Sequence, residues 1–240
     1  MTWSIIARDP ATGAFGAAVA TRFVAAAGLC LNVASGVGAV ATQATINPTY
    51  GPRGLRLLAD RPAPAVVRDL CATDHGRDHR QVHVVDVTGE TAAHTGPACG
   101  PWSGHTTRPG VSVAGNVLAG PQVVEQTLTA YLDEDRPFPE RLLAALQAGQ
   151  DAGGDARGRQ SAGILVYGKE EYPDLSLRVD DHPDPIAELH RIYGQWLLDF
   201  AAARTYMATR EDPAGVYDPE VLDAELRRRL ADPAARTYPV

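Results

Sequence analysis

The sequence contains little lysine and cysteine, and each scarcity limits the kinds of catalytic or metal site that the chain can form. Lys169 is the single lysine among the 22 lysine and arginine residues, so a catalytic lysine has one possible position. The three cysteines, Cys30, Cys71 and Cys99, are odd in number and lack the Cys-x-x-Cys or Cys/His spacing of a zinc site. No His-Glu-x-x-His motif is present either. We therefore expect buried thiols in a reducing compartment, no metal and no cofactor.

Long apolar stretches and an excess of positive charge are also absent. Residues 1–30 carry Arg8, Asp9 and Arg22 and have no continuous apolar segment of the signal-peptide kind. No stretch approaches the ~20 apolar residues of a membrane span. The formal net charge of −7 argues against nucleic acid and anionic membranes as partners. We expect a cytoplasmic protein that binds neither.

The order of the predicted elements indicates an α+β protein. Strands are expected at 2–7, 15–21, 28–34, 36–42, 81–86, 91–95, 111–114, 161–167 and 175–179. Helices are expected at 50–60, 63–73, 120–133, 137–151 and 185–205, with a last one after Asp218. Hairpins in place of strict β-α-β alternation favour antiparallel sheets, so we expect two sheets between two helix layers. The small residues of 15–21 indicate an element packed close to that backbone.

Thr2 is the first candidate for chemistry. Removal of Met1 leaves a hydroxyl and an α-amine on one residue, and an amine with a pKa near ~7.7–8.0 is able to accept the hydroxyl proton. The alternative is an ordinary N-terminal threonine. Its place at the start of a buried strand favours the nucleophile.

Three further groups are candidates around Thr2. Arg22 follows the hairpin partner strand, where its charge would depress the pKa of the amine, and the alternative is an ordinary surface arginine. Gly115 and Asn116 follow a short strand, and an asparagine amide is a natural donor to an oxyanion, although a Gly-Asn turn explains the pair equally well. Asp155 and Arg159 lie in the segment GGDARGRQSAG, where an arginine cluster either binds a substrate carboxylate or forms structural ion pairs.

The remaining candidates are more isolated. Tyr50 and Arg53, in NPTYGPRG, either face a cleft or cap a helix. His94, in AAHTG, and His105, in WSGHT, are candidate general bases, although a single histidine of this kind is more often structural.

Five ordered blocks carry a resemblance to a known family: MTWSIIARDPATGAFGAAVATRF, GVGAVATQATINPTYGPRGL, RQVHVVDVTGETAAHTG, GNVLAG and GGDARGRQSAGILV. Together they resemble the domain of unknown function 1028 family over residues 1–181, and that family is similar to the N-terminal nucleophile (Ntn) hydrolases. The resemblance implies a four-layer α-β-β-α sandwich whose nucleophile is the first residue of the mature chain, the place of Thr2. The lysine used by the proteasome-like branch has no counterpart here, because Lys169 follows a late strand.

These observations lead to one function and two alternatives. The first is an amidohydrolase that cleaves a small-molecule amide bond through Thr2. The second is a non-catalytic Ntn-fold assembly or binding protein. The third, a flavin oxidoreductase, is disfavoured because no Gly-x-Gly-x-x-Gly turn joins a strand to a helix. We expect a domain at 1–211 and a C-terminal helical extension at 212–240 that packs on its own body or on a neighbouring subunit. A homo-oligomer, a dimer or larger, is therefore predicted.

Overall fold

The structure is a computed structural model that describes residues 2–133 and 135–238. The chain forms two compact units, one up to Ile186 and one from Ala187 onward. In the described part of the chain, no helix has both the length and the hydropathy needed to cross a bilayer.

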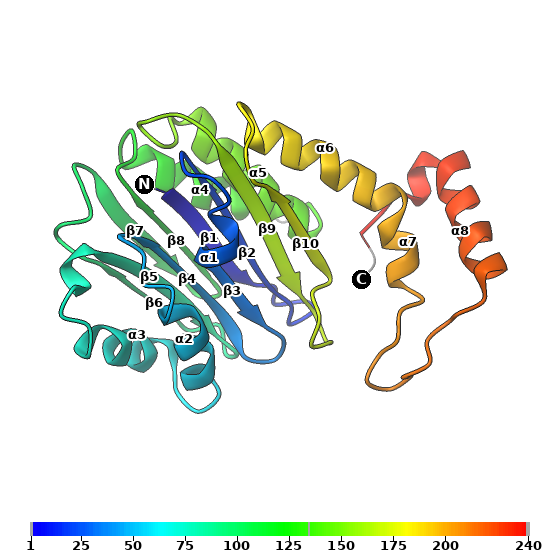
Figure 1. Ribbon diagram of the computed structural model, residues 1–240, viewed down its shortest axis with the longest axis horizontal. Coiled ribbons are helices and arrows are strands. Elements are labelled where there is room, and N and C mark those ends of the chain that lie inside the picture. Colours follow the sequence, from blue (N-terminus) through cyan, green and yellow to red (C-terminus); the bar gives the residue numbers. More distant parts are fainter. Residues whose placement is uncertain (1, 134, 239–240) are drawn as a thin grey trace. The chain divides into compact units, whose positions relative to one another are not determined.

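The larger unit contains a six-stranded antiparallel sheet with the first strand of the chain in its interior (Figure 1). Its order is β10-β9-β2-β1-β8-β7. The bounds are β1 Thr2–Arg8, β2 Phe15–Thr21, β7 Ser103–Arg108, β8 Val111–Asn116, β9 Ser161–Tyr167 and β10 Leu175–Val179. Because β1 pairs with β2 on one side and β8 on the other, neither of its edges is open.

A four-stranded antiparallel sheet of order β3-β4-β5-β6 packs against this sheet. Its strands are β3 Leu31–Ala34, β4 Gly38–Ala44, β5 Arg80–Asp86 and β6 Thr91–Thr95. The space between the sheets holds an apolar cluster around Ile6, Phe15 and Val19 of the larger sheet and Ala39 and Val85 of the smaller one. Since side chains alternate across a strand, these positions define the inner face of each sheet.

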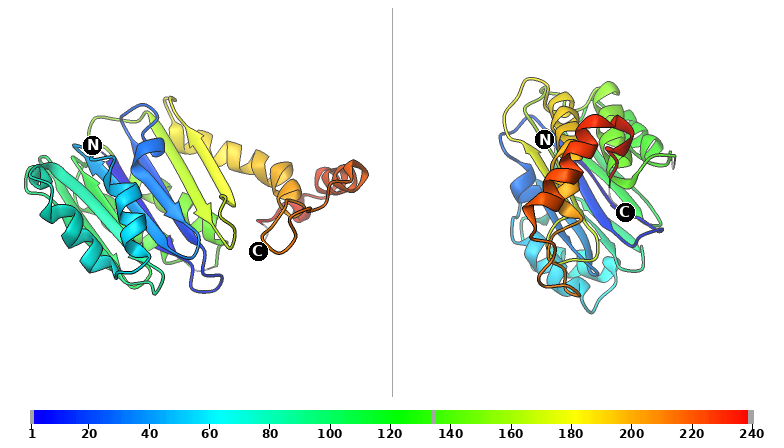
Figure 2. Two further views of the ribbon diagram at one scale, coloured as in Figure 1. Left: turned by 60° about the horizontal axis from the view of Figure 1, so that its bottom comes forward. Right: turned by 90° about the vertical axis from the view of Figure 1, so that its right-hand side faces the viewer.

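Helices cover both outer faces, as the views in Figures 1 and 2 show. The helices α2 (Tyr50–Leu58) and α3 (Ala63–Ala72) pack on the smaller sheet, and α4 (Gln122–Tyr131) and α5 (Phe138–Asp151) pack on the larger one. A Cβ atom on Gly16 of β2 would lie 2.5 Å from Leu142 of α5, so the close approach expected for this strand is confirmed. The predicted α+β, four-layer α-β-β-α fold class is likewise confirmed.

Several element bounds differ from the expectation. The predicted strand at 28–34 begins as a short helix, α1 (Ala27–Cys30), and only β3 is extended. Strand β7 was not predicted, because SGHTTR has no apolar alternation and pairs at a sheet edge. Gly115 and Asn116 are the last two residues of β8 rather than a turn after it.

The second unit is helical. The helix expected at 185–205 is broken into α6 (Pro185–Leu198) and α7 (Phe200–Arg204), and the Asp199 side chain caps α7. The predicted last helix is confirmed as α8 (Pro219–Ala231), with Asp218 accepting a 2.9 Å hydrogen bond from the Glu220 N–H. Within this unit the ring of Trp196 stacks 5.8 Å from that of Tyr238, and 6.3 Å separate it from Tyr193.

Candidate active site

Thr2 lies at the start of β1, directly opposite Thr21 of β2 on one side and Asn116 of β8 on the other. Its exposed fraction is 6%. The alternation along β1 places its side chain on the inner face with Ser4 and Ile6. The Thr2 hydroxyl lies 3.1 Å from the Thr21 hydroxyl, so it has a neighbour that orients it.

Three buried carboxamides surround this end of β1: Gln43 of β4, Gln81 of β5 and Asn116. Gln43 Nε2 and Asn116 Nδ2 approach the carbonyl oxygen of Thr2 to 3.4 and 3.3 Å. Both also donate to Gln81 Oε1, at 2.8 and 2.9 Å. The backbone of Thr2 is therefore held by a connected polar network that spans both sheets.

The network continues to a fully buried histidine. His83 Nε2 lies 2.8 Å from Ser4 Oγ, and its Nδ1 lies 3.0 Å from Ser112 Oγ. Ser4 also donates to Gln43 Oε1 at 2.8 Å, so the one hydroxyl proton of Ser4 is used and His83 Nε2 must be the donor to Ser4. Burial lowers the pKa of His83 to about 3, with a further contribution from the charge of His105, so the imidazole is neutral.

Strained backbone lies at the same end of the sheets. Among the residues that the structure describes, three other than glycine have a left-handed φ: Ala25 at 52°, Ala44 at 70° and Val117 at 50°. Ala44 directly follows Gln43, and Val117 directly follows Asn116. A left-handed β-branched residue is a genuine outlier, and such strain concentrates at functional sites. These conformations mark the Thr2 end as the candidate site.

Asp155 fixes the loop that leads into β9. Its side chain has no exposed surface and accepts hydrogen bonds from the backbone N–H groups of Arg22 and Arg157, at 2.8 and 2.9 Å. It also pairs with the Arg157 guanidinium at 3.1 Å. The Arg22 guanidinium donates to Gln160, and Arg159 pairs with Asp184 at 3.3 Å. Asp155 thus joins the end of β2 to the loop, whereas Arg22 and Arg159 direct their charged groups to other partners.

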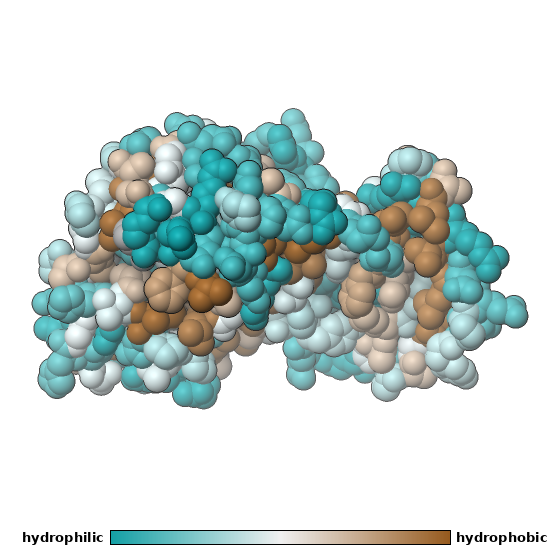
Figure 3. Space-filling model, turned by 45° about the horizontal axis from the view of Figure 1, so that its top comes forward, coloured by the Kyte–Doolittle hydropathy of each residue, from teal (hydrophilic) through white to brown (hydrophobic). Residues whose placement is uncertain are grey.

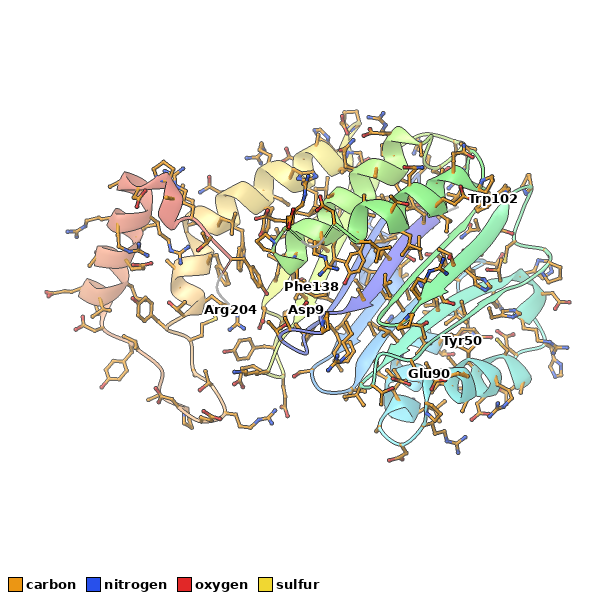
Figure 4. All side chains as sticks on the ribbon, turned by 180° about the vertical axis from the view of Figure 1, so that it is seen from behind. Asp9, Tyr50, Glu90, Trp102, Phe138 and Arg204 are labelled. Carbon is orange, nitrogen blue, oxygen red and sulfur yellow. The ribbon has the colours of Figure 1, made fainter. Side chains whose placement is uncertain are left out.

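Tyr50 and Arg53 lie in the helix layer outside the smaller sheet, where Figure 4 labels Tyr50. The Tyr50 hydroxyl donates to Asp74 at 2.9 Å, and burial together with this hydrogen bond raises the pKa of Tyr50. Arg53 donates to Thr73 at 3.2 Å. They are not brought together with Thr2, because the inner face of this sheet carries Gln43 and the outer face carries the Tyr50 cluster.

The two remaining histidine candidates lie on different sheets, His94 on β6 of the smaller sheet and His105 on β7 of the larger one. His94 is opposite Val82 in the ladder, a position on the outer face, and its Nε2 lies 2.9 Å from the Arg77 carbonyl oxygen. His105 of β7 lies 2.9 Å from Thr95 Oγ1, which also accepts a hydrogen bond from Gln81. Burial lowers the pKa of His105. His105 is therefore the histidine candidate that connects to the inner network.

The chemistry available at the Thr2 end is nucleophilic and polar. Across residues 2–133 and 135–238, no group of three or more His, Cys, Asp or Glu side chains is placed to hold a metal ion. Sequence reasoning missed Gln43, Gln81 and His83, although polar residues at inward positions of the strands GAVATQA and RQVHVVD are a usable signal.

Two antiparallel sheets packed between helix layers, with a buried threonine beginning a central strand, define a four-layer α-β-β-α sandwich with a polar site at one end. The chain belongs to the family of unknown function DUF1028, whose model matches residues 2–189. A crystal structure of protein SPO2555 from Silicibacter pomeroyi, assigned to the same family, is similar with a TM-score of 0.84 and 32% identity, covering 90% of this chain and 99% of that one.

A second structure, Anbu (ancestral beta-subunit) from Yersinia bercovieri, is similar with a TM-score of 0.42 and 13% identity, covering 82% of this chain and 96% of that one. A search of the curated proteins found no match.

Proposed function

We propose that the protein is an N-terminal nucleophile amidohydrolase that cleaves a small-molecule amide bond through Thr2 after Met1 is removed. The observation that carries the proposal is the position of Thr2: buried at the start of a central strand, with its hydroxyl 3.1 Å from that of Thr21 and a carboxamide on the opposite neighbour, Asn116. The adjacent left-handed backbone at Ala44 and Val117 supports the same location.

In the proposed reaction, Thr2 Oγ attacks the amide carbonyl carbon while the α-amine of Thr2 takes the hydroxyl proton. The ammonium then gives this proton to the departing amine, the C–N bond breaks, and an ester on Thr2 remains. Water attacks the ester and its proton passes to the α-amine. The ammonium returns this proton to Thr2 Oγ as the ester C–O bond breaks, and the acid leaves. Asn116 Nδ2 is the proposed donor to the oxyanion. It would give up its long 3.3 Å contact with the Thr2 carbonyl oxygen and donate to the oxyanion instead.

The other predicted residues have supporting roles in this proposal. Asp155 holds the loop beside β2 through its contact with the Arg22 backbone. Gly115 leaves no room for a side chain, since a Cβ atom there would lie 2.3 Å from Leu118. Binding of a substrate carboxylate by Arg22 or Arg159 requires these side chains to leave Gln160 and Asp184. Tyr50, Arg53 and His94 remain predictions as substrate contacts.

The test combines intact mass with acylation. The purified protein is expected to lack the mass of Met1 and to gain an acetyl group from p-nitrophenyl acetate. Thr2→Ala is processed equally well, because alanine is also small, but is expected to lose the acetylation. Thr2→Ser should keep it, and Thr129→Ala, which removes an exposed helical hydroxyl, should behave as wild type. Equal acetylation of Thr2→Ala and wild type would refute the proposal.

The second candidate is a non-catalytic assembly protein, and exposed apolar side chains favour it. Phe23, Val24 and Leu29, in the segment after β2, have exposed fractions of 62%, 53% and 58%. Figure 3 shows hydrophobic surface gathered in patches between hydrophilic regions. Retention of Met1 together with a sedimentation coefficient that rises with concentration would favour this candidate. A Phe23→Ser variant that stays monomeric would assign the contact.

A further inference from the structure

We propose that Gln81 is a positioning residue that holds the Asn116 carboxamide with its oxygen free, and that this oxygen accepts a hydrogen bond from the α-ammonium group of Thr2. The inference rests on the proposed function, because a free α-amine exists only after Met1 is removed. Asn116, the proposed oxyanion donor, would then also bind the α-ammonium group, and Gln81 would orient Asn116.

The orientation of Gln81 is fixed by two backbone carbonyl groups. Gln81 Nε2 lies 2.8 Å from the Gly115 carbonyl oxygen and 3.1 Å from that of Gly104. A carbonyl oxygen only accepts hydrogen bonds, so the atom of Gln81 that faces these two groups must be the amino group. Gln81 Oε1 therefore points the other way, toward Gln43 and Asn116.

The orientation of Asn116 follows from that of Gln81. The atom of Asn116 at 2.9 Å from Gln81 Oε1 must be a donor, which makes it Nδ2. The second Nδ2 hydrogen is directed at the Thr2 carbonyl oxygen, 3.3 Å away. Asn116 Oδ1 is then left fully buried, and it has no hydrogen-bond partner among the described residues.

A buried acceptor without a donor is rare and calls for an explanation. Asn116 is directly opposite Thr2 in the ladder, a relation that places the two Cα atoms about 4.5–5.5 Å apart. A peptide nitrogen at Thr2 carries one hydrogen, whereas an ammonium group carries three. Removal of Met1 therefore adds donors beside a carboxamide whose free atom is an acceptor, and the hydrogen bond favours the charged form of the amine.

Few ionisable groups compete with this contact. His83 on β5 is neutral, and its nitrogens are occupied by Ser4 and Ser112. The Asp155 carboxylate is occupied by two backbone N–H groups and a guanidinium. Other charged or titratable groups of the surrounding segments are Arg22, Arg80, His105, Arg157 and the thiols of Cys30 and Cys99, whose pKa is raised by burial.

The test measures the pKa of the Thr2 amine by NMR in protein labelled with ¹⁵N-threonine. Asn116→Ala is expected to lower the proton affinity of the amine about tenfold, which is about one pKa unit. Gln81→Met frees the Asn116 carboxamide to rotate and should also lower the pKa of the Thr2 amine. Gln81→Glu should keep the pKa of the Thr2 amine at its wild-type value, because a protonated carboxyl group donates to the Gly115 carbonyl oxygen and still presents an oxygen to Asn116.

Thr42→Val is the matched control. It removes a buried hydroxyl beside Gln43 on the other face of β4 and should leave the pKa of the amine unchanged. If Gln81→Met fails to fold, Gln81→Glu and Asn116→Ala still decide the outcome. A free amine whose pKa is the same in Asn116→Ala and wild type would overturn this inference alone. A mass that retains Met1 would overturn it together with the proposed function.

Discussion

Replacing His83 by glutamine is expected to reduce the amount by which the free energy of unfolding falls in mild acid. The folded protein holds His83 neutral with a pKa of about 3, whereas a histidine in the unfolded chain has a pKa near ~6.5. Below pH ~6.5 the unfolded state therefore binds a proton that the folded state excludes. The stability contribution is complete above this pH and is lost as the pH falls toward 3.

The magnitude follows from the two pKa values. Each pH unit in this window lowers the free energy of unfolding by about 1.4 kcal/mol, so acidification from pH ~6.5 to ~4.5 removes roughly 2–3 kcal/mol. Carboxylates such as Asp74, whose pKa is lowered by hydrogen bonds from Asn47, Gly76, Tyr50 and Arg80, act only below pH ~4. Between pH ~4 and ~6.5 the pH dependence of the free energy of unfolding therefore comes from histidine.

The assay is urea unfolding of wild type and His83→Gln across this pH range. Glutamine retains one donor for Ser4 and one acceptor for Ser112, so the variant should fold, with a loss of about 1–3 kcal/mol at neutral pH. Its free energy of unfolding should then change less with pH than that of wild type, by about 1.4 kcal/mol per unit. Identical slopes for the two proteins would show that His83 does not titrate as described.

Three further predictions concern the framework of the site. Val117→Gly should raise the free energy of unfolding, measured in urea, by up to about 1 kcal/mol, because glycine accepts the φ of 50° without strain. A fall in the free energy of unfolding by more than about 1 kcal/mol would contradict strain at Val117. Asp155→Ala should lower it by about 3–5 kcal/mol, since the Arg157 guanidinium and two backbone N–H groups lose their acceptor; a loss below 1 kcal/mol would show that the loop is held otherwise. Gly149→Ala should lower it by about 1–3 kcal/mol and change the fluorescence of Trp3, because the new Cβ would lie 2.6 Å from Trp3 Nε1; an unchanged spectrum would argue against this packing.

Much of the architecture could be predicted from the sequence because its signals are local. The turn at 9–13 between two short stretches of apolar and small residues identifies the β1–β2 hairpin, and Pro137 marks the start of α5. Asp218 followed by Pro219 likewise identifies the start of α8.

The sequence suggested some residues of the candidate site, and the residues it missed share one physical property. Thr2 and Asn116 are opposite each other in the ladder. Gln43, Gln81 and His83 come from the other sheet, and their role depends on which strands face each other, a relation that no local pattern specifies. Domain bounds at 211 and 212 remain a prediction.

The interior position of β1 has a consequence for biosynthesis. Its partner β2 follows immediately, but β8 begins at Val111, so the second edge of β1 stays unpaired until about a hundred further residues have been translated. At ribosomal speeds of about 5–20 residues per second, that delay lasts roughly 5–20 s. During this interval Thr2 is not yet flanked by β8, whereas in the folded protein it is buried with an exposed fraction of 6%, so an aminopeptidase at the ribosome would reach this end of β1 more easily before the sheet is complete. If Met1 is removed as the proposed function requires, timing during translation rather than the finished fold would then decide which molecules gain the free amine.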